Sequence, residues 1–333
     1  FVSAPVSLHS SFSGSKRKFD DPSTLVVDLL STEREFSQLS KWERAFRKTQ
    51  SFEDSKINSG KNRYPDVLPF DSNRVRLTTL ASDYINASHI HLEDDSPSFI
   101  ACQAPLPSTF YDFWWMIFEQ QSAVIVSLTN LVENNRVKAN RFWPTAGERL
   151  RFGNLTVTFL KSKQYGDIPV NCFRLSLLEN NTIVHERTIY HLNFTQWGDM
   201  GIPSTFSVVQ DLAKLMGICH QGGVNAGFSG PIVVHCSAGI GRTGTFIAIS
   251  HLMQLGAKSG CSGLALNAFE VVKTLRSQRM GMVQTLDQYF FIQHCVLDFL
   301  KSNHKSISVK RHKRCHSDVV PEILTQSLET VVY

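Results

Sequence analysis

The sequence has 333 residues, of which 42% are hydrophobic, 11% aromatic and 19% charged. These proportions exclude a disordered polymer, a collagen and a small disulfide-stapled scaffold, and they require a substantial folded core. The net charge of +5 belongs to the ends, because residues 1–20 carry +2 and residues 301–333 carry +3. The neutral stretch between them argues against a nucleic-acid-binding surface, so we expect no nucleic-acid partner.

The cysteines also limit the class of protein. There are seven, an odd number, and they are widely spaced without a C-x-x-C pair. This pattern indicates neither a disulfide framework nor a zinc site, and free thiols are typical of a reducing compartment. No apolar run in the sequence approaches the ~18 residues that span a bilayer. We therefore expect a cytoplasmic protein without a membrane span.

The predicted elements begin after a Ser-rich, basic stretch at residues 1–22, which lacks periodicity and predicts a flexible N-terminal arm. From Leu25 to Lys48 apolar residues recur at spacings of three and four, which predicts amphipathic helices. Alternating or compact β-branched stretches then predict strands, and later periodic stretches predict helices. The predicted strands are 124–126, 155–159, 173–177 and 232–234, and the predicted helices are 243–255, 264–278 and 286–300.

The organisation along the chain is simple. Residues 23–301 contain no internal repeat and no linker-like stretch, so we interpret them as one α+β, or mixed α/β, domain. The basic, Ser-containing residues 302–333 predict a disordered tail. Within it, Lys310–Arg314 would suit a nuclear address or an acidic partner, although a solvated terminal run is the commoner explanation.

The most informative segment runs from Pro231 to Phe246, where a buried strand leads through a loop of small residues into a helix. Gly239, Gly241 and Gly244 allow the backbone to curl and to turn successive N–H groups inward, which builds a nest for an oxyanion. A dianion bound there would also sit at the helix N-terminus, where unpaired N–H groups favour negative charge.

Two side chains of this segment suit phosphoryl chemistry. A cysteine near a helix N-terminus can have a pKa of ~3.5 to 7.5, so Cys236 is a candidate thiolate nucleophile. Arg242, at the far lip of the loop, has a planar guanidinium that matches two phosphate oxygens. For either residue alone, the alternative is a glycine-rich turn with an inert cysteine and a surface arginine.

The stretch from His235 to Gly244 matches the pattern H-C-S-x-G-x-G-R-[ST]-G in full and resembles the signature loop of the classical, non-receptor type protein tyrosine phosphatases. The resemblance extends over about residues 25 to 300. It implies one large domain with a central mixed, highly twisted β-sheet flanked by helices. It also implies that phosphate is bound by Ser237, Ala238, Gly239, Ile240, Gly241 and Arg242, with His235 and Thr243 in supporting roles.

Two more segments resemble substrate-handling loops of this family. Lys61–Phe70 looks like the phosphotyrosine-recognition loop, in which Tyr64 would stack on the substrate ring and Asp66 would hydrogen-bond the peptide backbone. Trp197–Pro203 looks like the mobile acid loop, usually W-P-D-x-G-x-P, and by that match Asp199 is the general acid. Without the signature loop, a half-buried core aromatic and a solvated turn aspartate would be the commoner interpretations.

The acid loop departs from the family pattern at Gly198, where the family has proline. Glycine lacks the fixed φ of proline, so we expect the closed form of the loop to be less pre-organised. We expect glycine at this position to affect the turnover rate more than the type of reaction.

Residues 131–138 and 280–289 resemble supporting loops of the family. In the second, Gln284 would contact the substrate and position the water of a second reaction step. The supporting residues implied by the match are Gln288 as helper of Gln284, Glu133 as the brace of Arg242, and Lys138 near the acid loop.

The resemblance implies a protein-tyrosine phosphatase that acts by two displacements. Cys236 would attack phosphorus to give a phosphocysteine while Asp199 protonates the tyrosine oxygen. Water positioned by Gln284 would then release phosphate. The arginine and the backbone dipoles would supply the charge stabilisation, so no metal ion or other cofactor is expected.

Two other functions stay open from the sequence. One is a module that binds phosphotyrosine without turnover, which the presence of Cys236, Arg242 and Asp199 disfavours. The other is a phosphatase for phosphoserine, phosphothreonine or inositol phosphates, which Tyr64 and a signature loop without lysine disfavour. The implied partners are phosphotyrosine-containing proteins, among them activated kinases such as MAP kinases, and we expect a monomer in the cytoplasm, with the nucleus as a second compartment.

Overall fold

The structure is a computed structural model that describes residues 29–78, 80–92, 97–258 and 267–312. The predicted N-terminal arm at 1–22 lies outside these ranges. So do residues 313–333 of the predicted tail.

Nine strands of the described residues form one mixed sheet, in the order β1-β2-β3-β11-β4-β10-β9-β8-β7. The central strands β3, β11, β4 and β10 are parallel to one another, and the outer neighbours are antiparallel. Strands β5 and β6 form a separate hairpin. The strands are β1 (Arg74–Arg76), β2 (Tyr84–Ile90), β3 (Phe99–Cys102), β4 (Val124–Ser127), β5 (Val132–Glu133), β6 (Arg136–Val137), β7 (Arg149–Phe152), β8 (Leu155–Tyr165), β9 (Ile168–Glu179), β10 (Thr182–Asn193) and β11 (Ile232–His235).

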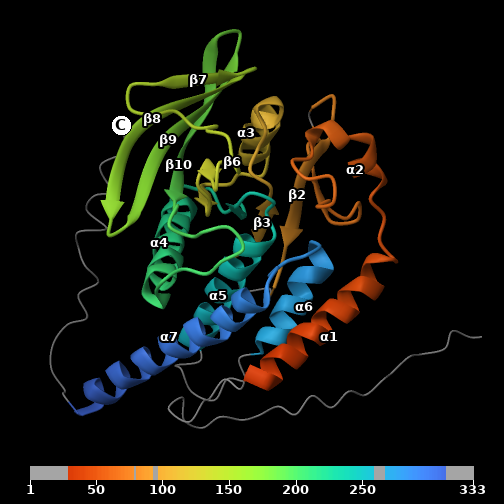
Figure 1. Ribbon diagram of the computed structural model, residues 1–333. Helices are drawn as coiled ribbons and strands as arrows, with labels where there is room; N and C mark the ends of the chain where they lie inside the picture. The colour runs from red at the N-terminus through yellow and green to blue at the C-terminus, as the bar shows by residue number, and fades with distance from the viewer. Residues whose placement is uncertain (1–28, 79, 93–96, 259–266, 313–333) are drawn as a thin grey trace, which may run out of the picture.

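The helices gather mainly on one side of the sheet, where Figure 1 shows α1, α5, α6 and α7 close together. Among the described residues, no helix combines the length and the apolar character needed to cross a membrane. The helices are α1 (Leu29–Arg47), α2 (Glu53–Ile57), α3 (Phe110–Glu119), α4 (Phe206–Asn225), α5 (Gly241–Lys258), α6 (Ala268–Gln278) and α7 (Leu286–His312), with the short 3₁₀ turns η2 (Ser59–Lys61) and η3 (Pro107–Thr109).

The central strands are buried on both faces and therefore support two cores. Successive side chains of a strand point to opposite faces, so Ile125 and Val233 pack with α3 in one core. Val124 and Val234, one residue away on the same strands, pack in the other core with α1, α4, α5, α6 and α7. The prediction of one mixed α/β domain with a central sheet between helices is confirmed.

The site lies where the central parallel strands end. Strand β11 lies between β3 and β4 in the middle of the sheet. It ends at His235, and α5 begins at Gly241, so residues 236–240 connect a central strand directly to a helix N-terminus. The carboxyl ends of parallel strands are the usual place for ligand sites in α/β sheets.

The predicted strands are confirmed as parts of β4, β8, β9 and β11, and the predicted helices as α1, α5, α6 and α7. Two long elements, β10 and α4, were not predicted. The end of α7 was predicted wrongly: the helix runs to His312 rather than Leu300, so the first residues of the predicted tail are helical. Residues 301–312 contain neither Gly nor Pro, so no local stop signal ends the helix at the expected point.

Candidate active site

The signature loop, residues 235–244, is shaped by glycines at two close approaches. Gly239 has a φ of +74°, and a Cβ atom there would lie 2.1 Å from the carbonyl oxygen of Cys102. A Cβ atom at Gly244 would lie 2.6 Å from the backbone nitrogen of Val283. Only glycine fits either position, because the neighbour is backbone that cannot move aside.

A buried arginine outside the signature loop fixes the direction of its peptide groups. Arg279 is completely buried, and its guanidinium donates to the carbonyl oxygens of Gly239 (2.9 Å) and Ala238 (3.1 Å). A peptide N–H points opposite to its carbonyl, so holding these two carbonyls outward turns the following N–H groups inward. Sequence reasoning missed Arg279, because a lone arginine gives no sign of the distant backbone it contacts.

Cys236 lies at the floor of this loop with its side chain almost fully buried. The N–H of Gly239 donates to the Cys236 sulfur at 3.3 Å. Burial alone raises the pKa of a thiol, but the positive charge of Arg242 and hydrogen bonding from Thr243 and Gly239 outweigh it, so the pKa of Cys236 lies below its ordinary value. The Thr243 hydroxyl is buried and has no other hydrogen-bond partner. It is therefore available to stabilise the Cys236 thiolate.

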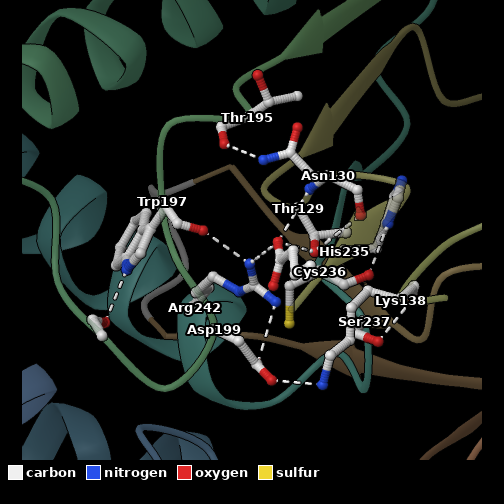
Figure 2. Close-up of polar contacts among 12 residues, drawn as sticks. Thr129, Asn130, Lys138, Thr195, Trp197, Asp199, His235, Cys236, Ser237 and Arg242 are labelled. Atoms are coloured by element: carbon white, nitrogen blue, oxygen red, sulfur yellow. Dashed lines mark hydrogen bonds and ion pairs between the residues drawn. The ribbon is translucent and has the colours of Figure 1, made fainter. Parts of the chain in front are cut away.

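Arg242, at the start of α5, is only 2% exposed and is held from two sides. One guanidinium nitrogen, Nη1, donates to the Glu133 carboxylate and to the Trp197 carbonyl, each at 2.7 Å. The other, Nη2, lies 3.3 Å from the Asp199 carboxylate. Figure 2 shows the guanidinium between these groups with the Cys236 sulfur beside it.

Glu133 belongs to the β5–β6 hairpin, and its carboxylate oxygen is itself fixed. It accepts hydrogen bonds from the Thr129 hydroxyl (2.9 Å) and the Asn130 N–H (3.1 Å). The Asn130 amide in turn donates to the Thr195 carbonyl at 2.7 Å, as Figure 2 shows. The hairpin is thus tied both to Arg242 and to the segment that leads into the acid loop.

The acid loop, residues 197–203, folds over the same place. Its Trp197 ring is buried and donates to the Gly201 carbonyl at 2.9 Å. The Asp199 carboxylate pairs with Lys138 at 2.5 Å, and this hydrogen bond raises the pKa of the Lys138 ammonium. Gly198 has open space around its missing Cβ. Met200 has a φ of +58°, an unusual backbone conformation for a residue with a side chain.

Tyr64 stands at the wall of the site, in the loop that follows η2. Its hydroxyl lies 2.8 Å from the Ser237 hydroxyl, which donates to the Lys138 carbonyl at 2.6 Å. The Ser237 oxygen therefore accepts the proton of Tyr64. Arg63 anchors the segment through the carbonyls of Ala104 and Pro105, each at 2.9 Å.

The two glutamines before and within α7 approach the other side of the signature loop. The side-chain oxygen Oε1 of Gln288 accepts a hydrogen bond from the Gln284 backbone N–H at 2.9 Å. A Cβ atom at Gly241 would lie 3.0 Å from the Gln284 side-chain oxygen and 3.2 Å from the Gln288 nitrogen, so both side chains pack directly on the loop.

One pocket brings most of the predicted residues together. It is lined by Tyr64, Asp66, Lys138, Asp199, Cys236, Ser237, Ala238, Ile240, Gly241, Arg242, Gln284 and Gln288. It also includes two residues that sequence reasoning missed, Val67 and Met200, each next to a predicted one. Four predicted residues lie outside its lining and support it from behind or from the side: Glu133, His235, Gly239 and Thr243.

The chemistry of the pocket is that of an anion site with a nucleophile. Arg242, Lys138 and the inward N–H groups favour a dianion beside a thiol of lowered pKa. In the part of the chain that the structure describes, no three His, Cys, Asp or Glu side chains gather in a way that would hold a metal ion.

The chain is similar in sequence to known protein-tyrosine phosphatases. The sequence model of the family described as protein-tyrosine phosphatase matches residues 58–298. The chain is 42% identical over 250 residues to tyrosine-protein phosphatase 3 of Dictyostelium discoideum, covering 73% of this chain and 25% of that protein. It is 38% identical over 267 residues to the mouse (Mus musculus) tyrosine-protein phosphatase non-receptor type 4, covering 78% of this chain and 27% of that protein.

The fold is also similar to that of a solved protein-tyrosine phosphatase structure. The catalytic domain of human protein tyrosine phosphatase non-receptor type 18 superposes with a TM-score of 0.73 at 32% identity, covering 82% of this chain and 97% of that one. The chain spans only about a quarter of the length of the two relatives above. The family match nevertheless covers well over half of the 333 residues. The chain therefore belongs to the protein-tyrosine phosphatase family, and it carries the catalytic domain of that family.

Proposed function

We propose that this chain hydrolyses phosphotyrosine on proteins through a phosphocysteine intermediate. The observation that carries the proposal is the Cys236 thiol, whose pKa is lowered in a pocket that also contains Arg242 and Asp199. A thiolate beside a guanidinium is both a nucleophile and part of a phosphate site.

In the first step, the Cys236 thiolate attacks phosphorus, and the bond between phosphorus and the tyrosine oxygen breaks. Arg242 and the inward N–H groups hold the equatorial phosphate oxygens, where charge is concentrated in the transition state. Asp199 gives its proton to the departing phenolate. The contacts of Asp199 with Arg242 (3.3 Å) and Lys138 (2.5 Å) support this role, because they hold its carboxyl group beside the guanidinium that would bind the phosphate.

In the second step, water attacks the phosphocysteine, the sulfur–phosphorus bond breaks and inorganic phosphate leaves. Asp199, now a carboxylate, accepts the proton of that water. Gln284 positions the water with the help of Gln288, and Thr243 donates to the departing sulfur. The packing of both glutamine side chains against Gly241 supports this assignment.

We attribute selectivity for phosphotyrosine to Tyr64, which would deepen the pocket. Tyr64 rises from the wall beside Ser237 and would stack on the aromatic ring of the substrate. The shorter phosphoserine side chain would not bring its phosphorus to Cys236. Asp66 is exposed at the rim, where it is accessible to the backbone of a bound peptide.

The physiological setting belongs to the same proposal. We propose phosphotyrosine-containing signalling proteins as substrates, among them activated protein kinases such as MAP kinases. The chain would act as a monomer in the cytoplasm, and in the nucleus where Lys310–Arg314 serves as an address.

The test compares phosphate release from two versions of one peptide, carrying phosphotyrosine or phosphothreonine at the same position. The native chain, Cys236→Ser and Asp199→Ala are assayed in parallel. We expect release from the phosphotyrosine peptide only, abolished in Cys236→Ser and slowed by about 10²- to 10⁴-fold in Asp199→Ala. Tight binding of the phosphotyrosine peptide without any release would contradict the proposal and identify a binding module.

A further inference from the structure

A row of polar side chains crosses the buried centre of the sheet behind Cys236. It contains one residue from each of four adjacent strands: His235 on β11, Ser127 on β4, His191 on β10 and Asn171 on β9. His235 is paired in register with Ser127, and His191 with Asn171. The neighbours in this row are within hydrogen-bond distance from one end to the other.

The distances define a chain of four contacts. The Ser127 hydroxyl lies 2.7 Å from Nε2 of His235 and 2.7 Å from Nε2 of His191. Nδ1 of His235 lies 3.1 Å from the carbonyl oxygen of Cys236, and Nδ1 of His191 lies 3.4 Å from the side-chain nitrogen of Asn171. The row therefore ends on the peptide group of the nucleophile.

Both histidines are neutral at physiological pH. Burial lowers the pKa of His235 to about 4 and that of His191 to about 3. The rings of Phe142 and Phe173 pack around them and keep water out. A neutral imidazole has one N–H and one acceptor nitrogen, so each histidine can donate only once.

This condition fixes the direction of all four hydrogen bonds. The Cys236 carbonyl can only accept, so the proton of His235 is on Nδ1 and its Nε2 accepts from the Ser127 hydroxyl. Ser127 has a single proton, so it must accept from Nε2–H of His191. Nδ1 of His191 is then an acceptor for the Asn171 amide. Every donor points toward Cys236, and hydrogen bonds aligned in one direction polarise one another.

We propose that Ser127 and His191 are positioning residues for the nucleophile: by fixing the tautomer of His235, they hold the Cys236 peptide in place and favour the thiolate. The inference rests on the proposed function for its meaning in catalysis. Without the Ser127 hydroxyl, His235 can place its proton on Nε2, and the hydrogen bond to the Cys236 carbonyl is lost. A purely structural role would lower stability without changing the acidity of Cys236.

The test measures the alkylation rate of Cys236 by iodoacetamide as a function of pH, which reports the thiolate directly and requires no turnover. We expect Ser127→Ala to raise the pKa of Cys236 by about 0.5 to 1 pH unit. Ser127→Thr keeps the hydroxyl and should restore the native profile. Ser122→Ala is the matched control, because Ser122 is a fully buried serine just before β4 whose hydroxyl has no hydrogen-bond partner.

The other charged or titratable groups that act on Cys236 and His235 stay in place in these variants. They are Arg242 on α5, Arg279 after α6, Arg63 in the loop after η2 and Cys102 on β3. A change in the profile of Ser127→Ala that is absent from Ser122→Ala therefore reports on the row itself.

A second pair of variants tests the row one residue further away. His191→Phe fits the surrounding aromatic cage but removes the donor to Ser127, whereas His191→Gln keeps an amide donor. We expect His191→Phe to raise the pKa of Cys236 by a smaller amount than Ser127→Ala, and His191→Gln to recover part of the change. These variants also decide the matter where Ser127→Ala does not fold.

The outcomes separate this inference from the proposed function. In the native chain, kcat/KM for a phosphotyrosine peptide tests the function, and alkylation of Cys236 tests the row. A rise in the pKa of Cys236 in both Ser127→Ala and His191→Phe supports the row even where the chain has no phosphatase activity. Profiles that equal those of the native chain and of Ser122→Ala, with only the unfolding temperature lowered, would overturn it.

Discussion

Two buried cysteines at the ends of neighbouring parallel strands differ sharply in acidity. Cys102 is the last residue of β3 and pairs in register with His235, which immediately precedes Cys236. The two are 1% and 4% exposed. Burial raises the pKa of Cys102 to about 12, although the charge of Arg279 opposes it. The pKa of Cys236 lies below its ordinary value.

The difference shows that burial alone raises the pKa of a thiol, so that it stays protonated, and that the signature loop lowers the pKa of Cys236. Cys236 has left its strand and lies before the N-terminus of α5, where the Gly239 N–H and the Arg242 charge act on its sulfur. Two more distant cysteines behave like Cys102: burial raises the pKa of Cys219 on α4 and of Cys295 on α7 to about 12.

The largest difference in activity should appear when each of the two thiols is removed in turn. Cys236→Ala should reduce kcat on a phosphotyrosine peptide on the order of 10⁵- to 10⁶-fold, as expected for loss of a nucleophile. Cys102→Ala should leave kcat within about threefold and lower the free energy of unfolding by about 1 kcal/mol. Steady-state kinetics and urea unfolding of both variants give the comparison, and comparable losses of activity would contradict it.

Replacing Arg242 should have the second largest effect on kcat/KM. Arg242→Lys keeps the charge but loses the planar fork, and it should reduce kcat/KM by about 10³-fold. Arg242→Met also removes the charge that lowers the pKa of Cys236. Because the thiolate is the active form, kcat/KM rises as pH rises through this pKa, so in Arg242→Met the acidic limb should move to higher pH. A limb at the native position would show that another group sets the acidity.

Gly239 is the residue at which the signature loop contacts the backbone of Cys102. Its replacement should have the third largest effect. Gly239→Ala adds a Cβ atom 2.1 Å from the Cys102 carbonyl at a φ of +74°. We expect a loss of about 2 to 4 kcal/mol in the free energy of unfolding and about a 10²-fold lower kcat/KM. Gly147→Ala is the matched control, because Gly147 has a φ of +81° and open space around it. Equal kinetics in the two variants would rule out a role for this close approach.

The smallest effect should come from the acid loop. Gly198→Pro restricts the loop, and open space at this position makes the ring acceptable. We expect kcat to rise by about two- to fivefold, through a smaller entropy loss on closure. The alkylation rate of Cys236 should not change, which separates loop closure from nucleophile acidity. An unchanged or lower kcat would mean that closure does not limit turnover.

The residues that line the pocket could be predicted from the sequence more completely than the buried residues that hold them in place. The signature loop is contiguous, so Cys236 and Arg242 could be recognised together, and Glu133 and Tyr64 followed from the family match. Ser127, His191 and Arg279 could not be found in this way. Their partners are 20 to 193 residues away in the chain, and only the folded structure brings them together.

Two elements of the fold, α4 and β10, were missed because their local sequence does not reflect their tertiary packing. Helix α4 contains Gly217, Gly222 and Gly223, which lower helix propensity and hid it from periodicity. The structure gives a reason for Gly223: a Cβ atom there would lie 2.5 Å from the Cβ of Ala123, so the glycine lets α4 approach the sheet. Strand β10 was missed because its first half is exposed and shows no alternation of apolar and polar residues.

The measurement that tests the central claim most directly is a search for phosphate on Cys236. Gln284→Ala should slow the second step, so the chain is mixed with a phosphotyrosine peptide, quenched in acid within milliseconds and digested for mass spectrometry. We predict a phosphorylated peptide that contains Cys236 and appears together with the first equivalent of free tyrosine peptide. Release of the tyrosine peptide with no phosphate on Cys236, or with phosphate on another residue, would contradict the account.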